Sequence, residues 1–171
     1  MTHERSRPGR TTWLGVAFAV VFLAACSTPP AALRADTLAY LRKMSSWAPT
    51  EAETARTLER ILATEFVDEA EVLRQIADST PRLQRQLAEA EQYEPRTAEV
   101  RRIHAVYVAS WRTLLDGYSS ITAGFAAGDQ AKLSRGRDAM ARWRDSIMQV
   151  ARELRELRDR AGVDPNDITP S

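Results

Sequence analysis

The chain has 171 residues, with 24 basic and 23 acidic side chains, so its formal net charge at pH 7 is only +1. A protein that binds nucleic acid normally shows a clear basic excess, and we therefore expect no nucleic-acid partner. The single cysteine excludes a framework of disulfides within the sequence. The length is that of about one ordinary domain, which must be stabilised by packed apolar surface.

Residues 1–25 predict a secretory signal peptide. A basic start with Arg5, Arg7 and Arg10 precedes an apolar run from Trp13 to Ala25, and small residues end that run. This order is typical of a cleaved signal. The run has thirteen residues, whereas a transmembrane helix needs about 20. We therefore expect removal of this segment and no permanent membrane span.

The stretch Leu23-Ala24-Ala25-Cys26 resembles the lipobox of bacterial lipoproteins. The resemblance implies that Cys26 becomes the first residue of the mature protein and carries fatty acyl chains such as palmitate, which anchor it to a membrane. Cys26 could instead be an ordinary buried thiol, but its position in this motif favours lipidation. Residues 26–32 are then the lipidated cysteine and a short tether.

The tether and the residue after the cysteine predict the location of the protein. Ser27 to Pro30 can span less than about 20 Å, so the domain should lie close to the membrane. In enteric-type bacteria an aspartate after the lipid cysteine usually signals retention at the inner membrane, and Ser27 resembles the outer-membrane pattern instead. We expect the periplasmic face of the outer membrane if the source has two membranes, and otherwise the outer face of the cell membrane.

Residues 33–162 are expected to form a single helical domain. A short first helix is predicted from Leu33 to Trp47 and is expected to end at Pro49, because proline lacks a backbone N–H and restricts the residue before it. Thr50 and Glu53 then match a capping box, which indicates the start of a second helix.

The second helix carries apolar residues at helical spacings as far as Leu87. Asp68 and Thr80-Pro81 both resemble restart points, so we expect this helix to kink or to break near one or both of them.

A third helix is predicted from Pro95 to about Ala127. Its apolar and aromatic stripe contains Val100, His104, Tyr107, Trp111, Leu114, Tyr118, Ile121 and Phe125. Ser110, Gly117 and Gly124 recur beside this stripe at seven-residue intervals. Since a helical glycine costs about 1 kcal/mol relative to alanine, we expect a neighbouring helix to approach closely there.

A fourth helix is predicted to start at the N-cap Asp129 and to end at Gly162. Its a and d positions over four heptads are Leu133, Gly136, Met140, Trp143, Ile147, Val150, Leu154, Leu157 and Ala161. Residues 163–171 are expected to be a flexible tail.

Antiparallel packing of the last two helices about Gly128 would place Trp111 beside Trp143 and Gly117 opposite Met140. No strand-like alternation of useful length occurs. The predicted fold is therefore all-α, an antiparallel bundle of three long helical segments plus a short N-terminal helix.

Charge is distributed unevenly along the domain. Residues 51–94 hold eleven acidic residues and five arginines, whereas residues 95–161 hold thirteen basic residues and eight acidic ones. Such asymmetry can mark a binding face. The favoured interpretation is that an acidic helix packs beside a basic one within the bundle.

His104 is the only histidine after the signal segment. Imidazole can bind haem iron or a metal ion in a helical bundle, so His104, Tyr107, Trp111 and Trp143 form a candidate ligand-binding set, with Met148 as a possible second haem ligand. No Cys-x-x-Cys-His, Glu-x-x-His or His-Glu-x-x-His motif accompanies it. The favoured interpretation is a half-buried histidine hydrogen-bonded to a neighbour, with no metal site and no cofactor.

No catalytic residues are predicted. The sequence lacks a Gly-x-Ser-x-Gly elbow and a glycine-rich phosphate loop, and its carboxylates recur at solvent-facing spacings. The expected function is a non-enzymatic envelope lipoprotein that binds a protein partner or supports envelope structure. The alternative is a haem or metal carrier that uses His104 and the neighbouring aromatic residues.

A second, weaker resemblance covers about half of the domain. Tyr93-Glu94-Pro95, then His104 and Tyr107, then Ala126-Ala127-Gly128-Asp129 before a heptad helix resemble small uncharacterised secreted helical proteins of bacteria. This resemblance implies no activity.

Overall fold

The computed structural model describes residues 30–63 and 68–168. These residues form four long helices and a short 3-10 helix, and they contain no strand. The helices are α1 (Pro30–Ala63), α2 (Glu69–Glu91), α3 (Ala98–Ala127), α4 (Gln130–Ala161) and η1 (Pro165–Asp167). The predicted all-α bundle is confirmed. The signal segment and Cys26 lie outside the described residues.

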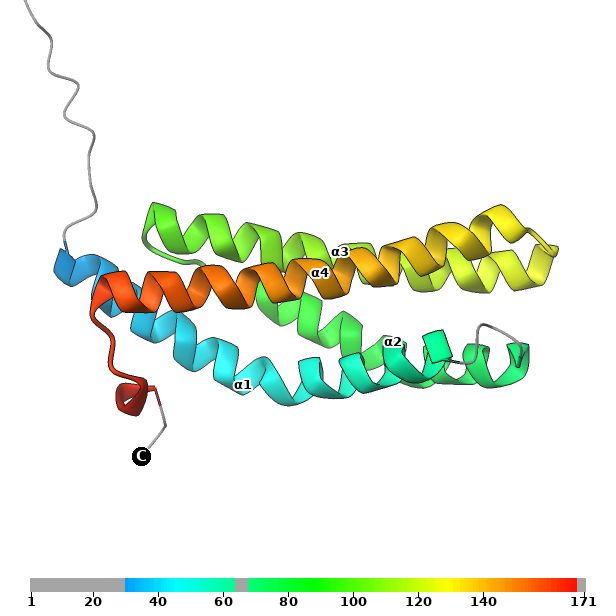
Figure 1. The fold of residues 1–171 in the computed structure, drawn as a ribbon, viewed down its shortest axis with the longest axis horizontal. Helices are drawn as coiled ribbons and strands as arrows, with labels where there is room; N and C mark the ends of the chain where they lie inside the picture. The colour runs from blue at the N-terminus through cyan, green and yellow to red at the C-terminus, as the bar shows by residue number, and fades with distance from the viewer. Residues whose placement is uncertain (1–29, 64–67, 169–171) are drawn as a thin grey trace, which may run out of the picture.

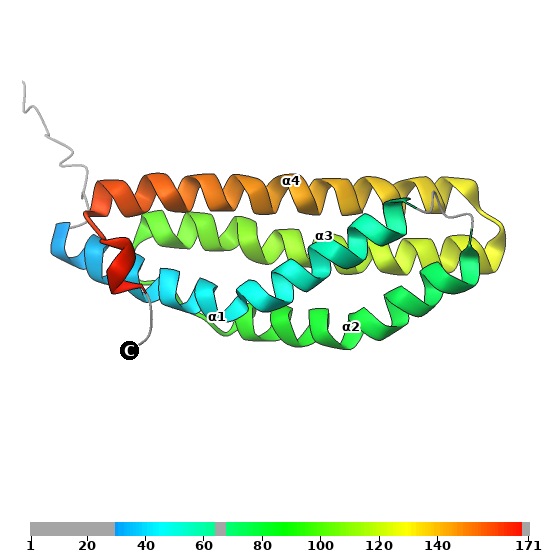
Figure 2. The same ribbon diagram turned by 60° about the horizontal axis from the view of Figure 1, so that its bottom comes forward.

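The helices form two antiparallel hairpins that pack against each other (Figures 1 and 2). Each helix contacts the next along the chain, and α4 closes the arrangement by packing against α1. The result is an up-and-down four-helix bundle. The start of α1 and the end of α4 lie at the same end of the bundle, at the left of Figure 1.

The expectation that Pro49 ends the first helix is wrong, because α1 continues through it. Trp47 is 2% exposed on one side of the proline, and Glu51 on the other side accepts a 2.7 Å hydrogen bond from the Tyr107 hydroxyl. Tertiary contacts therefore hold the helix on both sides. Pro49 itself is exposed, and so is Ser45, so water can reach the Ser45 carbonyl that the proline leaves without a donor. The bundle accordingly has four long helices, not three and a short one.

The predicted restart at Asp68 is confirmed, whereas α2 continues through Pro81. The Asp68 side chain accepts a 3.0 Å hydrogen bond from the Glu71 backbone and caps α2. Residues 64–67 lie outside the described part of the chain. The ribbons of α1 and α2, which each contain a proline, bend along their length, while α3 and α4 run nearly straight (Figure 2).

The predicted close approach of α3 and α4 is confirmed. The rings of Trp111 and Trp143 lie 5.3 Å apart. A Cβ atom at Gly117 would lie 2.8 Å from the Ala139 Cβ and 3.8 Å from the Met140 backbone nitrogen. Gly117 therefore faces the predicted segment of α4, but the space that it leaves is used by Ala139 and the backbone and not by the Met140 side chain.

The predicted caps of the α3–α4 hairpin are also confirmed. Gly128 and Gly162 have positive φ values of 61° and 64°, which glycine adopts without strain. The Asp129 side chain accepts hydrogen bonds from the backbone of Ala131 and Lys132.

Residues 163–168 do not form the flexible tail that the sequence predicts, because they pack against the bundle. Val163 is buried, and η1 is bound to α1 by two arginines. Arg34 donates to the Gly162 carbonyl at 3.1 Å and to the Asp167 carboxylate at 3.0 Å, and Arg42 donates to the Asp167 carbonyl at 2.7 Å. Residues 169–171 lie outside the described part of the chain.

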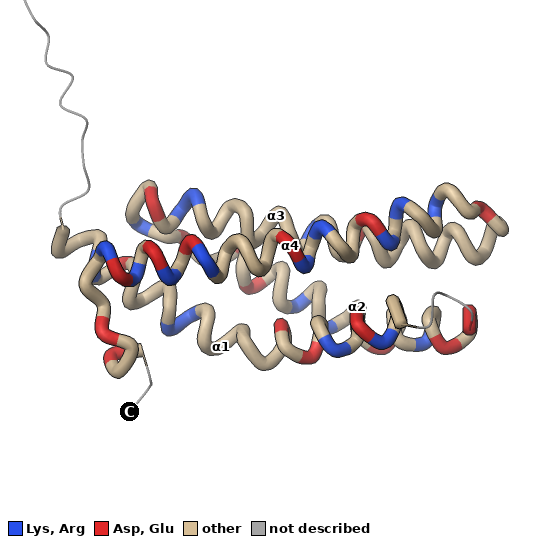
Figure 3. The backbone as a smooth tube through the Cα atoms, in the orientation of Figure 1, with Lys and Arg blue, Asp and Glu red and all other residues tan. Residues whose placement is uncertain are grey.

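Basic and acidic residues are interspersed along α4 (Figure 3). Between helices, Arg112 of α3 pairs with Glu91 of α2 at 2.8 Å, which joins the basic and the acidic parts of the sequence. This contact agrees with the favoured interpretation of the charge asymmetry. None of the helices in residues 30–63 and 68–168 has the length and apolar character needed to cross a membrane.

Candidate functional site

The structure brings the four predicted ligand-site residues together in one aromatic cluster. Ring centroids are 6.4 Å apart for His104 and Tyr107, 6.0 Å for Tyr107 and Trp111, and 5.3 Å for Trp111 and Trp143. All four side chains are buried. The rings contact one another directly, so the cluster is part of the packed core.

Both ring nitrogens of His104 have hydrogen-bond partners. Nε2 lies 3.0 Å from the Ala90 carbonyl oxygen, which can only accept, so Nε2 carries the proton. Nδ1 lies 3.2 Å from the Tyr40 hydroxyl, which then donates to it. Burial lowers the pKa of His104 and favours the neutral imidazole that this pattern requires. His104 would have to give up one of these bonds before it could bind a metal or haem.

Three further aromatic residues that were not predicted as part of the ligand-binding set complete the cluster. Trp47 stacks on Tyr107 with ring centroids 5.3 Å apart and planes within 8°, and Tyr40 and Tyr93 lie 5.5 Å apart. Tyr40 and Trp47 are seven residues apart, a spacing that places them on one helix face. That spacing was the available signal for a shared aromatic face.

A carboxyl group from α1 enters the edge of this cluster. The Tyr107 hydroxyl donates to Glu51 at 2.7 Å and accepts a 2.8 Å hydrogen bond from the Gln86 amide. Burial raises the pKa of Glu51, and the hydrogen bond from Tyr107 offsets part of that rise. This chain of bonds connects α1, α2 and α3 through one tyrosine.

An apolar groove runs between α1 and α4 on the outside of the bundle. It consists of two adjoining cavities of about 340 and 270 Å³ that share Ala55, Trp143, Arg144 and Met148. We call it the α1/α4 groove; its remaining lining residues are Ala48, Glu51, Ala52, Leu58, Glu59, Leu62, Met140 and Ile147. Met148 is 55% exposed and is the only large apolar side chain classed as exposed among the described residues.

The groove follows from the residue types on α1. Ala48, Ala52 and Ala55 are spaced four and three residues apart, so they lie on one face of the helix. Because their side chains are small, they leave space opposite the larger side chains of α4. Met148 lies in this groove, and His104 is not among the residues that line it. The structure therefore does not place the two predicted haem ligands in this one cavity.

Within residues 30–63 and 68–168, no group of three or more His, Cys, Asp or Glu side chains is arranged to hold a metal ion.

Comparisons of the chain with protein-family models, with curated proteins and with solved structures find no match.

Proposed function

We propose that this protein is a lipid-anchored, non-enzymatic component of the bacterial cell envelope that binds another protein, or supports envelope structure, through the α1/α4 groove. The observation that supports partner binding is the exposed Met148 beside the alanine face of α1. An amphipathic helix can lay its apolar side chains into such a groove. Glu59 and Arg144 line the same groove and offer charged contacts to the polar edges of that helix.

The anchor in this proposal is a lipid on Cys26. Three residues separate Cys26 from the start of α1, so the lipid lies within about 15 Å of the end of the bundle where α1 begins. The proposed location is the periplasmic face of the outer membrane in a bacterium with two membranes, and otherwise the outer face of the cell membrane.

The anchor is tested by the mass of the protein extracted from its own membranes. We expect a chain that begins at Cys26 and carries the added mass of acyl groups, and we expect Cys26→Ser to abolish both the acylation and the membrane association. An unmodified chain that begins at Met1 would remove the basis for the anchor.

Partner binding is tested by photo-crosslinking in intact cells. A photoreactive amino acid replaces Met148 in one variant and Ala109, an exposed residue of α3 that does not line the groove, in a control. We expect a covalent adduct of defined mass from position 148 and none from position 109. Equal labelling from both positions, or none from either, would contradict a partner in the groove.

A haem or metal carrier that uses His104 is the alternative function. Its support is the aromatic surroundings of His104, but the two hydrogen bonds of that imidazole favour a structural role. The geometry therefore supports the partner-binding function better.

A further inference from the structure

The two walls of the α1/α4 groove carry opposite charges. Glu59 of α1 and Arg144 of α4 line the same cavity of the groove, and both residues are exposed. The other acidic residue of the groove, Glu51, accepts a hydrogen bond from Tyr107 in the interior, so Glu59 is the acidic side chain that remains for a partner. A partner that matches both walls must therefore place a basic group over α1 and an acidic group over α4.

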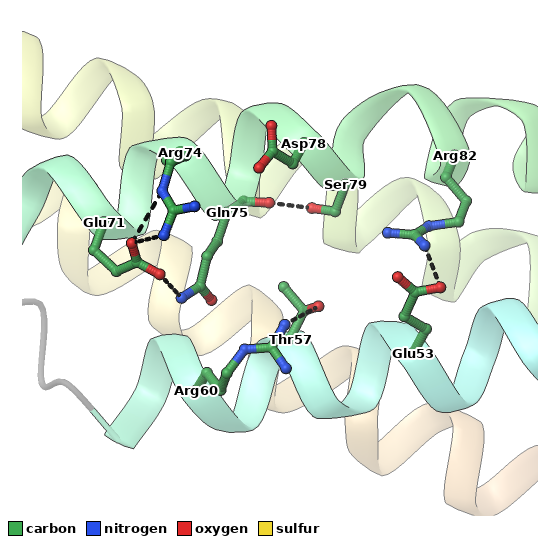
Figure 4. Close-up of a pocket in the computed structure, with 9 residues that line it drawn as sticks. All are labelled: Glu53, Thr57, Arg60, Glu71, Arg74, Gln75, Asp78, Ser79 and Arg82. Carbon is green, nitrogen blue, oxygen red and sulfur yellow. Dashed lines mark hydrogen bonds and ion pairs between the residues drawn. The ribbon is translucent and has the colours of Figure 1, made fainter.

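Glu59 and Arg144 do not pair with each other across the groove. Within residues 30–63 and 68–168, no ion pair joins Glu59 to a basic side chain, and Arg144 pairs only with Asp145, its neighbour in the sequence, at 3.7 Å. The side of α1 that faces α2 is different, because Glu53 bonds there to Arg82 across the two helices (Figure 4). The acidic residue between α1 and α2 is thus paired within the chain, whereas the one at the groove is not.

The shapes of the two walls also complement each other. Met148 of α4 is 55% exposed. The small side chains Ala52 and Ala55 of α1 line the same cavity as Met148, so they lie at a similar height along the bundle. One wall therefore offers a large apolar side chain, and the other wall offers the space for one.

We infer that the partner in the α1/α4 groove is a second copy of this chain, bound about a two-fold axis that runs along the groove. A half-turn about this axis places α1 of each copy over α4 of the other, and it keeps the direction of both helices and the height of each residue along them. Glu59 of each copy then faces Arg144 of the other, and Met148 faces the alanines of the other α1. Every contact occurs twice, as in an isologous interface.

The place of the proposed lipid anchor agrees with this axis. The start of α1, which follows Cys26 closely, lies at one end of the bundle (Figure 1). Because the axis is parallel to the helices, both copies have this end on the same side, and both lipids can enter one membrane. A two-fold axis across the helices would place the anchors at opposite ends. The inference rests on the proposed function for the groove and for this anchor.

The groove is small for a dimer that persists in solution. Its lining residues on α1 extend from Ala48 to Leu62, which is about 21 Å of helix, and two helices side by side are about 20 Å wide. A face of this size offers on the order of 400 Å² per copy, compared with roughly 800 Å² in a stable interface. Anchoring of both copies in one membrane raises their local concentration, so the association is tested in the membrane.

The test measures photo-crosslinking between two differently tagged copies in the same cells, with a photoreactive amino acid in place of Met148 in one copy. We expect an adduct of twice the mass of the chain that carries both tags. Glu59→Arg in both copies, or Arg144→Glu in both copies, should lower the yield of this adduct about tenfold, because like charges then face each other at both contacts.

A mixture of the two variants should restore the adduct. When one copy carries Glu59→Arg and the other carries Arg144→Glu, opposite charges face each other at both contacts of the mixed pair, so the yield should return close to that of the wild type. Arg135→Glu in both copies is the matched control and should leave the yield unchanged, since Arg135 is an exposed arginine of α4 that does not line the groove.

The outcomes separate this inference from the proposed function. An adduct with a different protein would keep a partner in the groove and overturn the second copy. An adduct with both tags whose yield is the same in every variant, or a mixture that fails to restore the yield, would overturn the two-fold arrangement. If position 148 gives no protein adduct at all, the inference and the proposed partner binding are both wrong.

Discussion

The two hairpins of the bundle share one topology and differ in how they are stabilised. In the α3–α4 hairpin, glycines at the interface let the backbones approach closely: a Cβ at Gly124 would lie 3.0 Å from the Leu133 backbone nitrogen. In the α1–α2 hairpin, the buried residues include threonines, a serine and a glutamine. Close backbone approach therefore characterises α3–α4, whereas the buried faces of α1 and α2 mix apolar with polar side chains.

Three side chains of α1 and α2 form hydrogen bonds across to the second hairpin. Asp36, Glu51 and Gln86 all bond to residues of α3 or of the turn before it. The comparison indicates that α3–α4 is the scaffold and that α1–α2 is attached to it by directional polar contacts. The proposed α1/α4 groove uses α1, the helix with the more polar buried face.

The largest expected effect comes from filling the α3–α4 interface. A Cβ at Gly136 would lie 2.9 Å from the Gly117 carbonyl oxygen and would collide with the Ile121 side chain. We expect Gly136→Ala to lower the free energy of unfolding by about 3 kcal/mol, measured by chemical denaturation. Ser134→Ala, at an exposed position of the same helix, should change it by less than about 0.5 kcal/mol. Equal stability of the two variants would show that the interface adjusts and that steric fit is not what stabilises this hairpin.

The next largest effect should come from the contact between the two hairpins at Asp36. One oxygen of this buried carboxylate accepts from the backbone of Arg96 at 3.0 Å, from the backbone of Thr97 at 2.8 Å and from the Thr97 hydroxyl at 2.7 Å. Asp36→Ala leaves these donors at the start of α3 unpaired, so the free energy of unfolding should fall by about 2 kcal/mol. Asp36→Asn keeps an acceptor oxygen and should lose less. An Asn variant as unstable as the Ala variant would assign the effect to the charge and not to the hydrogen-bond geometry.

The smallest of the three effects concerns Glu51 and depends on pH. Because burial raises the pKa of Glu51 above its ordinary value of 4.5, the folded state holds this proton more tightly than the unfolded state does. The stabilising contribution of the protonated group is complete below pH 4.5 and is lost as the pH rises through the folded-state pKa.

Glu51→Gln stays neutral at every pH and keeps an oxygen that can accept from Tyr107. Its stability should match the wild type in acid and exceed it increasingly toward neutral pH, as measured by urea unfolding at a series of pH values. Glu59→Gln, an exposed position of the same helix, should keep the wild-type pH dependence. If Glu51→Gln also keeps the wild-type dependence of stability on pH, Glu51 is not the group that causes this dependence.

Pro49 illustrates why part of the fold was predictable from the sequence and part was not. The local rule that proline ends a helix predicted two helices in place of α1. The side chains of α1 that face the core nevertheless keep the heptad spacing straight through the proline: Thr37, Tyr40, Met44, Trp47, Glu51, Thr54, Leu58 and Ile61. Five of these eight are polar or aromatic, so this face does not stand out in the sequence as a stripe of leucines.

The sequence by itself determined the α3–α4 hairpin, with its heptads, its glycine caps and the pairing of Trp111 with Trp143, because each of these depends on local spacing and on one short turn. Only the tertiary structure decided the partners of Asp36, Glu51 and His104. Those partners are distant in the chain; Asp36 and Thr97, for example, are 61 residues apart. Hydrogen bonds of this kind require the two hairpins to be packed together, and the same packing forms the α1/α4 groove.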